Sequence, residues 1–390
     1  MLAYPRWRAG LLAAAAVLLA GPGLACSSAR TPASGAGTGS RPGSSSGTAR
    51  PSAGGAGERP TSLPYLERIG GLGRPCAVLG AAGSVWVADF TSGRVDRLDP
   101  ATGKVTGHAT AGVQPCGMAW GAGSVWVENY GSNTVTRITP GTLATRSYAV
   151  GAAPYDVTFA AGAAWATNWA DGTVTRISAA TGKARTITVG SNPEGIAPAG
   201  GAVWVANNTS GTVSRIDTRT LKVTTLRTGG KPAWTAYHGG TVWVGDQAAG
   251  AVLTISAGTG KITGRARVGA QPNDGDVLGG AAWFPDAHGS LYRVSADGRT
   301  VAGPWKLPAA NPFTLAAYDG RLWIANFGGT DVLVVNPARL TVLAGSRRAA
   351  LRAAFPPRSL RRSFVAPGSL VSPGSAAALR ELRPAPPSAG

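Results

Sequence analysis

The chain has 390 residues, 44% of them hydrophobic, and a formal net charge of +19 at pH 7. Much of the excess charge lies at the two ends: residues 63–345 carry 23 basic and 16 acidic residues, whereas residues 346–390 carry eight and one. Because the sequence has no recognition helix or base-stacking motif, we exclude nucleic acid as a partner. The basic ends can attract an anionic membrane or cell-wall polymer.

The first segment, residues 1–25, has the pattern of a bacterial export signal peptide. Arg6 and Arg8 precede an apolar stretch over residues 11–20, and small residues follow before Cys26. The apolar stretch is too short for a comfortable membrane span. Residues 26–62 are rich in Ser, Gly, Ala, Thr and Pro and hold almost no large apolar group, so we expect a disordered tether.

The residues around Cys26 resemble the lipobox of bacterial lipoproteins, in which the cysteine becomes the lipidated N-terminus after cleavage. The sequence reads Gly23-Leu24-Ala25-Cys26, whereas the family prefers Leu three residues before the cysteine. The resemblance implies a lipid anchor on the outer face of the cell membrane. Small residues at Gly23 and Ala25 also suit ordinary signal peptidase, whose cleavage would release a soluble protein.

The central region repeats every 39 or 40 residues, as its tryptophans show. They are Trp86, Trp126, Trp165, Trp204, Trp243, Trp283 and Trp323. Each copy opens at a proline and holds four short strand patterns separated by Gly, Asn, Asp and Ser. The period predicts an all-β fold over residues 63–345: a seven-bladed β-propeller with four-stranded antiparallel blades and no helices.

A propeller usually closes its ring by joining both ends of the chain within one blade. Residues 65–70 resemble the fourth strand of a copy, so we predict that this N-terminal strand pairs beside residues 331–336. Residues 340–344 compete for the same position.

Cys76 and Cys116 each follow an opening proline and so occupy one position in adjacent blades. That position begins the innermost strand, where Cα atoms of neighbouring blades can approach the roughly 4.4–6.8 Å span of a disulfide. Because exported cysteine pairs tend to oxidise, we predict a Cys76–Cys116 disulfide. The alternative is two reduced, buried cysteines that act as small apolar residues.

The repeat ends near residue 345, and residues 346–390 are rich in Arg, Ala and Pro. Two hypotheses stay open for this basic tail: a shifted reading frame of a high-GC gene, or a segment that binds the cell wall. In either case we expect it to be largely disordered.

The repeats carry a family resemblance. Residues 201–223 read GAVWVANNTSGTVSRIDTRTLKV and residues 123–143 read GSVWVENYGSNTVTRITPGTL, and both resemble the YVTN and YncE-type β-propeller repeats. The resemblance covers roughly residues 63–345. The repeat pattern also resembles that of streptogramin B lyase, a relative in architecture. That enzyme family works with a histidine general base, supporting glutamates and a magnesium ion at one end of the channel.

Three histidines are available for such a role. We expect His108 on an outer strand and His238 on the opposite face from the site, so only His288, with Asp286 nearby, lies on the expected face. A solvated turn residue is the alternative for His288. Because no cluster of Glu and His accompanies it, we assign no catalytic residue, and an enzymatic role stays uncertain.

The starts of the inner strands carry Asp156, Glu194, Asn273 and Asp274, whose oxygens could hold calcium or magnesium. Senescence-marker-type lactonases use a comparable arrangement in a propeller of similar shape, although their repeats resemble these less well. The four residues belong to blades three, four and six, and capping of backbone groups at strand starts explains them without a metal. We therefore expect no cofactor.

Aromatic residues give the better indication of binding. One follows the second strand in each of blades one, two, three and seven, which are contiguous in a closed ring: Phe90, Tyr130, Trp169 and Phe327. The inner-strand starts on the same face add Tyr155, Trp234 and Phe313. This aromatic crescent predicts a binding surface for a sugar, a peptide or a flat ligand. Packing between blades is the alternative.

The sequence therefore predicts an exported, lipid-anchored, monomeric β-propeller that binds a protein, peptide or glycan at the cell surface. If Cys26 is not lipidated, we expect a secreted soluble protein. A metal-dependent propeller enzyme, similar to streptogramin lyases or to lactonases, is the alternative function.

Overall fold

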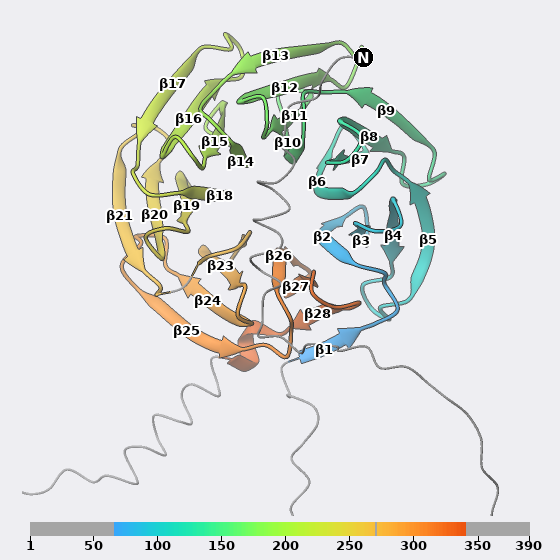
Figure 1. Ribbon diagram of the computed structural model, residues 1–390. Helices are drawn as coiled ribbons and strands as arrows, with labels where there is room; N and C mark the ends of the chain where they lie inside the picture. The colour runs from blue at the N-terminus through green and yellow to red at the C-terminus, as the bar shows by residue number, and fades with distance from the viewer. Residues whose placement is uncertain (1–65, 270, 341–390) are drawn as a thin grey trace, which may run out of the picture. The chain divides into compact units, whose positions relative to one another are not determined.

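The computed structural model describes residues 66–269 and 271–340, which form a ring of seven four-stranded antiparallel sheets (Figure 1). In six of the sheets the strands follow chain order from the inside of the ring to its rim. The seven-bladed β-propeller expected from the tryptophan spacing is confirmed. The expected signal peptide, tether and basic tail lie outside the described residues.

The first four blades each contain four consecutive strands. Blade one has β2 (Pro75–Ala81), β3 (Ser84–Asp89), β4 (Arg94–Leu98) and β5 (Val105–Thr110). Blade two has β6 (Pro115–Gly121), β7 (Ser124–Asn129), β8 (Thr134–Ile138) and β9 (Thr145–Ala149). Blade three has β10 (Pro154–Ala160), β11 (Ala163–Asn168), β12 (Thr173–Ser178) and β13 (Ala184–Thr188). Blade four has β14 (Pro193–Ala199), β15 (Ala202–Asn207), β16 (Thr212–Asp217) and β17 (Val223–Arg227).

The last three blades complete the ring. Blade five has β18 (Pro232–His238), β19 (Thr241–Asp246), β20 (Ala251–Ser256) and β21 (Ile262–Arg267). Blade six has β22 (Asp276–Leu278), β23 (Ala281–Asp286), β24 (Ser290–Val294) and β25 (Val301–Lys306). Blade seven has β26 (Pro312–Tyr318), β27 (Arg321–Asn326) and β28 (Val332–Val335), with β1 (Leu66–Ile69) as its outer strand.

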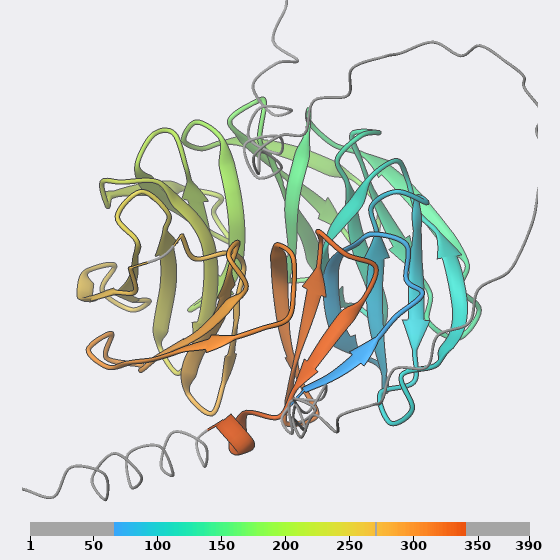
Figure 2. The same ribbon diagram turned by 60° about the horizontal axis from the view of Figure 1, so that its bottom comes forward.

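Strand β1 closes the ring by pairing antiparallel to β28, with Leu66 opposite Val335 and Ile69 opposite Val332 (Figure 2). The predicted N-terminal closure is therefore confirmed. Of the competing segment only Leu340 lies within the described residues, where it belongs to a helical turn over residues 337–340 and is buried against blade seven. This turn is a small departure from the expectation of no helices.

Four of the repeated tryptophans, Trp86, Trp126, Trp165 and Trp283, hold the turn between the first and second strands of their blades. The indole N–H of Trp86 donates to the carbonyl of Ala81 at 3.1 Å, and Trp126 donates to Gly121 at 3.0 Å in the same way. All seven rings lie in the hydrophobic layers between sheets and are at most 5% exposed. A large apolar ring fills the same position between sheets in every blade, which explains the period of the sequence.

Every inner strand begins on the same face of the ring, which also carries the turns between second and third strands. We call this the entry face. Near its centre the Sγ atoms of Cys76 and Cys116 are joined in a disulfide between blades one and two, with Cα atoms 5.1 Å apart. On the other side of blade one, the Thr314 hydroxyl donates to the carbonyl of Cys76 at 3.0 Å. The blades are thus tied together where the chain enters each inner strand.

Candidate ligand site at the mouth of the channel

A small cavity of about 40 Å³ opens where the inner strands begin. Six of the seven blades contribute to its wall. The lining includes Gly117, Tyr155, Asp156, Glu194, Gly195, Trp234, Asn273, Asp274, Phe313 and Thr314. We call this cavity the channel mouth. Its residues are far apart in sequence and meet only because the ring closes.

Glycines let the inner strands approach closely at this point. A Cβ atom on Gly195 would lie 2.5 Å from the Cα atom of Trp234, which belongs to the backbone of the next blade. A Cβ atom on Gly117 would lie 2.7 Å from Oδ1 of Asp156. Real Cβ atoms are not found that close to other heavy atoms, so these two positions require glycine.

Five carboxyl groups gather around the channel mouth, and two of them also hold blades together. Oδ1 of Asp156 accepts the N–H of Val157 at 2.7 Å, and Oδ2 accepts the N–H of Ile196 in blade four at 3.1 Å. Asp276 repeats this pattern between blades six and seven, where it accepts the N–H of Val277 at 2.7 Å and that of Ala317 at 2.9 Å. Their oxygens are engaged by backbone donors, as expected for residues at strand starts.

The other three carboxyl groups, on Glu128, Glu194 and Asp274, have fewer partners. Oε1 of Glu128 accepts the N–H of Gly117 at 2.9 Å, while its Oε2 is buried without a hydrogen-bond partner. Glu194 accepts from the side chain of Asn208 at 3.3 Å and from the indole of Trp169. Oδ1 of Asp274 accepts the N–H of the adjacent Gly275 at 3.0 Å. These three groups retain capacity to accept hydrogen bonds from a ligand.

Burial makes ionisation of these groups unfavourable. Desolvation raises the pKa of Glu194 to about 8. Hydrogen bonds from Trp169 and Asn208 and the nearby charge of Lys231 lower this pKa but do not offset the desolvation. Desolvation raises the pKa of Glu128 as well, and the charge of Asp156 adds to this shift. The pKa of Asp274 rises through desolvation and the neighbouring charges of Asp156 and Asp276. Desolvation also raises the pKa values of Asp156 and Asp276.

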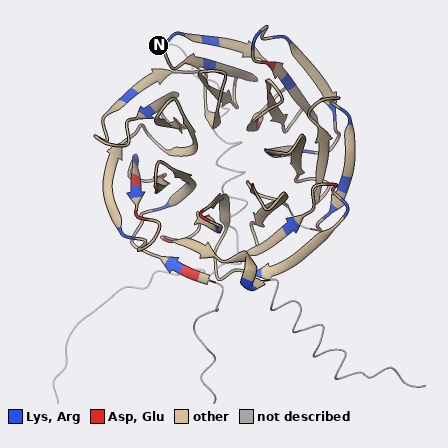
Figure 3. Cartoon of the chain, turned by 180° about the vertical axis from the view of Figure 1, so that it is seen from behind, with Lys and Arg blue, Asp and Glu red and all other residues tan. Residues whose placement is uncertain are grey.

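No ion pair between described residues joins a basic side chain to this acidic cluster, although the charge of Lys231 lies near Glu194. The ion pairs within residues 66–269 and 271–340 all involve other acids, on Glu67, Asp89, Asp96, Asp246 and Asp331. Lysine and arginine instead recur along the outer strands, as the blue segments of Figure 3 show. Many of the basic residues thus lie on the outer strands, away from the acids of the channel mouth.

Blade six is irregular where it supplies two of these acids. Its inner strand β22 pairs with β23 only over residues 276–278, and Pro272 makes a single isolated bridge to Asp286. Between them the N–H of Asn273 still donates to the carbonyl of Pro285 at 2.9 Å, and the side-chain amide of Asn273 donates to the carbonyl of Pro312 in blade seven at 2.9 Å. Asp274 follows directly and lines the channel mouth.

The seven aromatic residues of the predicted crescent lie on the entry face but form two groups. Phe90, Phe313 and Phe327 pack together where blades seven and one meet, with ring centroids 5.3 Å and 5.5 Å apart and the Arg74 guanidinium 3.9 Å from the Phe327 centroid. This group fits the packing alternative. Tyr130, Trp169, Tyr155 and Trp234 lie toward the acids instead, although Trp234 is only 2% exposed.

The three histidines lie away from the channel mouth. His108 on outer strand β5 contacts Asp96 at 2.6 Å, and His238 ends β18 on the opposite face. His288 is exposed in a turn of blade six, where its N–H donates to Oδ1 of Asp286. Within the described residues, no three His, Cys, Asp or Glu side chains are arranged to hold a metal ion.

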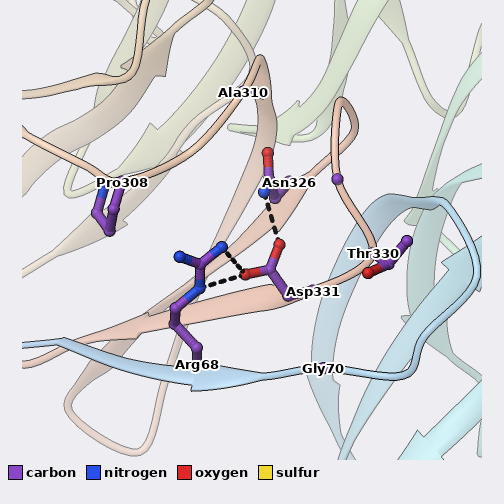
Figure 4. Close-up of a pocket in the computed structure, with 8 residues that line it drawn as sticks. Arg68, Gly70, Pro308, Ala310, Asn326, Thr330 and Asp331 are labelled. Atoms are coloured by element: carbon purple, nitrogen blue, oxygen red, sulfur yellow. Dashed lines mark hydrogen bonds and ion pairs between the residues drawn. The ribbon is translucent and has the colours of Figure 1, made fainter. Parts of the chain in front are cut away.

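A larger hollow of about 470 Å³ lies nearer the rim, between blades six and seven (Figure 4). Its charged groups already bind one another. The Arg68 side chain donates to Oδ2 of Asp331 at 2.6 Å, and the amide of Asn326 donates to Oδ1 at 2.6 Å. These contacts join β1 to the other strands of blade seven, so we assign them to closure of the ring.

No protein-family model and no curated protein matches the sequence. Among solved structures, virginiamycin B lyase from Staphylococcus aureus is similar with a TM-score of 0.62 and 19% identity, over 69% of this chain and 98% of that one. A catalytically inactive form of that lyase with quinupristin matches at 18% identity, with the same TM-score and coverage. Kuenenia stuttgartiensis hydrazine synthase matches with a TM-score of 0.59 and 14% identity, over 72% and 99%. These similarities establish the propeller fold and its distant likeness to a lyase.

Proposed function

We propose that this protein is an exported, lipid-anchored β-propeller that binds a ligand on its entry face. One observation carries the proposal: side chains with unused hydrogen-bonding capacity, on Glu194 and Asp274, meet aromatic side chains at a cavity that six blades build together. A cavity with a few convergent polar groups of perturbed pKa is a common feature of binding sites.

The export signal and the lipobox-like residues before Cys26 support a position at the cell surface. Within the described residues no helix is long and apolar enough to cross a membrane. The tether over residues 26–62 would then hold the propeller away from the lipid. A protein, peptide or glycan of the cell surface is the class of ligand that this arrangement can reach.

Co-purification from intact cells tests the proposal. The first variant, Tyr130→Ala with Trp169→Ala, removes two half-buried aromatics from the entry face. The matched control, Trp120→Ala with Tyr237→Ala, removes two aromatics that are 40% and 37% exposed near the opposite ends of their inner strands. We expect the first variant to lose the partner and the control to retain it. If the entry-face variant folds and retains every partner, the proposal is wrong.

A second candidate function is a lyase-like or lactonase-like activity at the same place. The raised pKa of Glu194, about 8, favours it, because a carboxyl group that is protonated near neutral pH can act as a general acid. The test is turnover of a streptogramin B antibiotic or a simple lactone, with and without magnesium. Turnover by the native chain that is lost in Glu194→Gln would establish catalysis, and loss in His288→Ala would place the base in blade six.

A further inference from the structure

The acids of the channel mouth surround a single side chain, Tyr155 of strand β10. The charges of Glu194, Asp274, Glu128 and Asp156 all raise the pKa of its phenol, in addition to desolvation. These carboxyl groups come from blades two, three, four and six. Tyr155 therefore lies among carboxyl groups from four blades, and it lines the same cavity as Asp156, Glu194 and Asp274.

Glu128 supplies an independent sign of a missing partner. Its side chain is 1% exposed, and it lies directly behind Gly117, which lines the channel mouth. Oε1 accepts the N–H of Gly117, but the buried Oε2 has no hydrogen-bond partner. A buried acceptor without a donor has lost its hydrogen bonds to water without replacement, which is unfavourable. The cluster therefore has at least one acceptor that lacks a donor.

The cavity limits what can supply such a donor. A volume of about 40 Å³ holds only a few groups of the size of a water molecule. The acids are not grouped for direct coordination of a metal ion within the described residues. Aromatic rings of Tyr155 and Phe313 form part of the wall, and aromatic faces attract organic cations. A compact cation with several N–H donors and an organic remainder matches all three features.

We propose that the channel mouth binds the primary ammonium group of its ligand, with Glu194 and Asp274 as acceptors and Tyr155 beside it. An ammonium group has three N–H donors, and its positive charge favours ionisation of the surrounding carboxyl groups, which burial opposes. The rest of the ligand extends over the aromatic residues of the entry face. This inference rests on the proposed function and narrows the ligand to amines, such as a peptide with a free N-terminus or lysine, or an amino sugar.

Benzylamine and benzyl alcohol are matched probes for this site, because they share a ring and differ in the charged group. Isothermal titration calorimetry of the full-length protein should give a dissociation constant for benzylamine at least about tenfold lower than that for benzyl alcohol. Glu194→Gln and Asp274→Asn should each weaken benzylamine binding by about tenfold or more, since each removes a carboxyl group that can ionise opposite the cation. Glu67→Gln, an exposed rim carboxylate, should leave binding unchanged.

If the Glu194 or Asp274 variant does not fold, Tyr155→Phe provides a second test, because it removes only the phenol hydroxyl among the acids. It should weaken benzylamine binding and leave any binding of benzyl alcohol unchanged. The ammonium site would be overturned if the two probes bound equally or if benzylamine did not bind. It would also be overturned if millimolar calcium displaced bound benzylamine. The proposed function would survive that result if the Tyr130 and Trp169 double variant still lost its partner.

Discussion

The carboxylate of Asp156 joins two blades at the axis of the ring, because its Oδ2 accepts the backbone N–H of Ile196 at 3.1 Å while its Oδ1 accepts that of Val157 at 2.7 Å. The same residue lines the channel mouth and raises the pKa values of Glu128 and Asp274. The contacts that stabilise the ring and the charges that define the candidate site thus share residues.

We predict that Asp156→Ala lowers the free energy of unfolding by about 1–3 kcal/mol, because it leaves the N–H groups of Val157 and Ile196 without their acceptor. Urea denaturation monitored by tryptophan fluorescence measures the change. Glu67→Ala, at an exposed rim carboxylate, is the control and should lie within about 0.5 kcal/mol of the native chain. A loss in Asp156→Ala no larger than in the control would contradict the bridging role.

Gly195→Ala should destabilise the ring by about 1–3 kcal/mol, because its Cβ atom would lie 2.5 Å from the Cα atom of Trp234 and would force blades four and five apart. Gly258→Ala is the matched control, since its Cβ atom meets nothing within 4 Å. Thermal denaturation compares the two. Equal melting temperatures would show that the inner strands tolerate a wider spacing at the channel mouth.

Stability should fall as the pH rises from about 4.5 to about 8. Glu194 has a pKa of about 8 in the folded protein, against an ordinary value of 4.5, so the folded state holds a proton that the unfolded state releases across this range. Its contribution is fully present below the unfolded pKa and is lost as the pH passes the folded value. The raised pKa values of Glu128, Asp156, Asp274 and Asp276 act in the same direction.

Glu194→Gln isolates that contribution, because the amide does not titrate. Melting temperatures measured from pH 4.5 to pH 9 should decline less steeply in this variant than in the native chain. Glu67→Gln should keep the native slope. A native slope in Glu194→Gln would mean that Glu194 titrates at an ordinary pH.

Replacing Cys76 and Cys116 together by serine should cost about 2–4 kcal/mol of stability, because the bond closes a loop of 40 residues in the unfolded chain. Denaturation of the native chain with and without reductant should give a difference of similar size. Peptide mapping without reductant verifies the bond directly. Free thiols at both positions in exported protein would restore the alternative of two reduced, buried cysteines.

The fold could be predicted from the sequence because every blade packs in the same way, and this shared packing produces the sequence repeat. Trp86 and its six equivalents occupy one position in each second strand, and the opening prolines mark where inner strands begin, so blade number and blade boundaries could be read directly. The closing strand β1 was also predictable, since residues 65–70 resemble the fourth strand of other copies.

The candidate site was only partly predictable. Asp156, Glu194 and Asp274 were identified at strand starts, but they line one cavity only because the closed ring brings the inner strands of blades three, four and six together. Glu128 was missed because it lies inside a strand that reads as core. The repeat could have revealed Glu128. The equivalent position holds Ala88, Ala206 and Ala325 in other blades, and blade two alone of the seven copies has an acid there.

The central claim is that a ligand occupies the entry face of the ring at the channel mouth. Hydroxyl-radical footprinting of the full-length protein, with and without the ligand that co-purifies from cells, measures this directly. The account predicts reduced modification at Tyr130, Tyr155 and Trp169, with Trp120 and Tyr237 unchanged. Protection of Trp120 and Tyr237 with no change at the other three residues would contradict it.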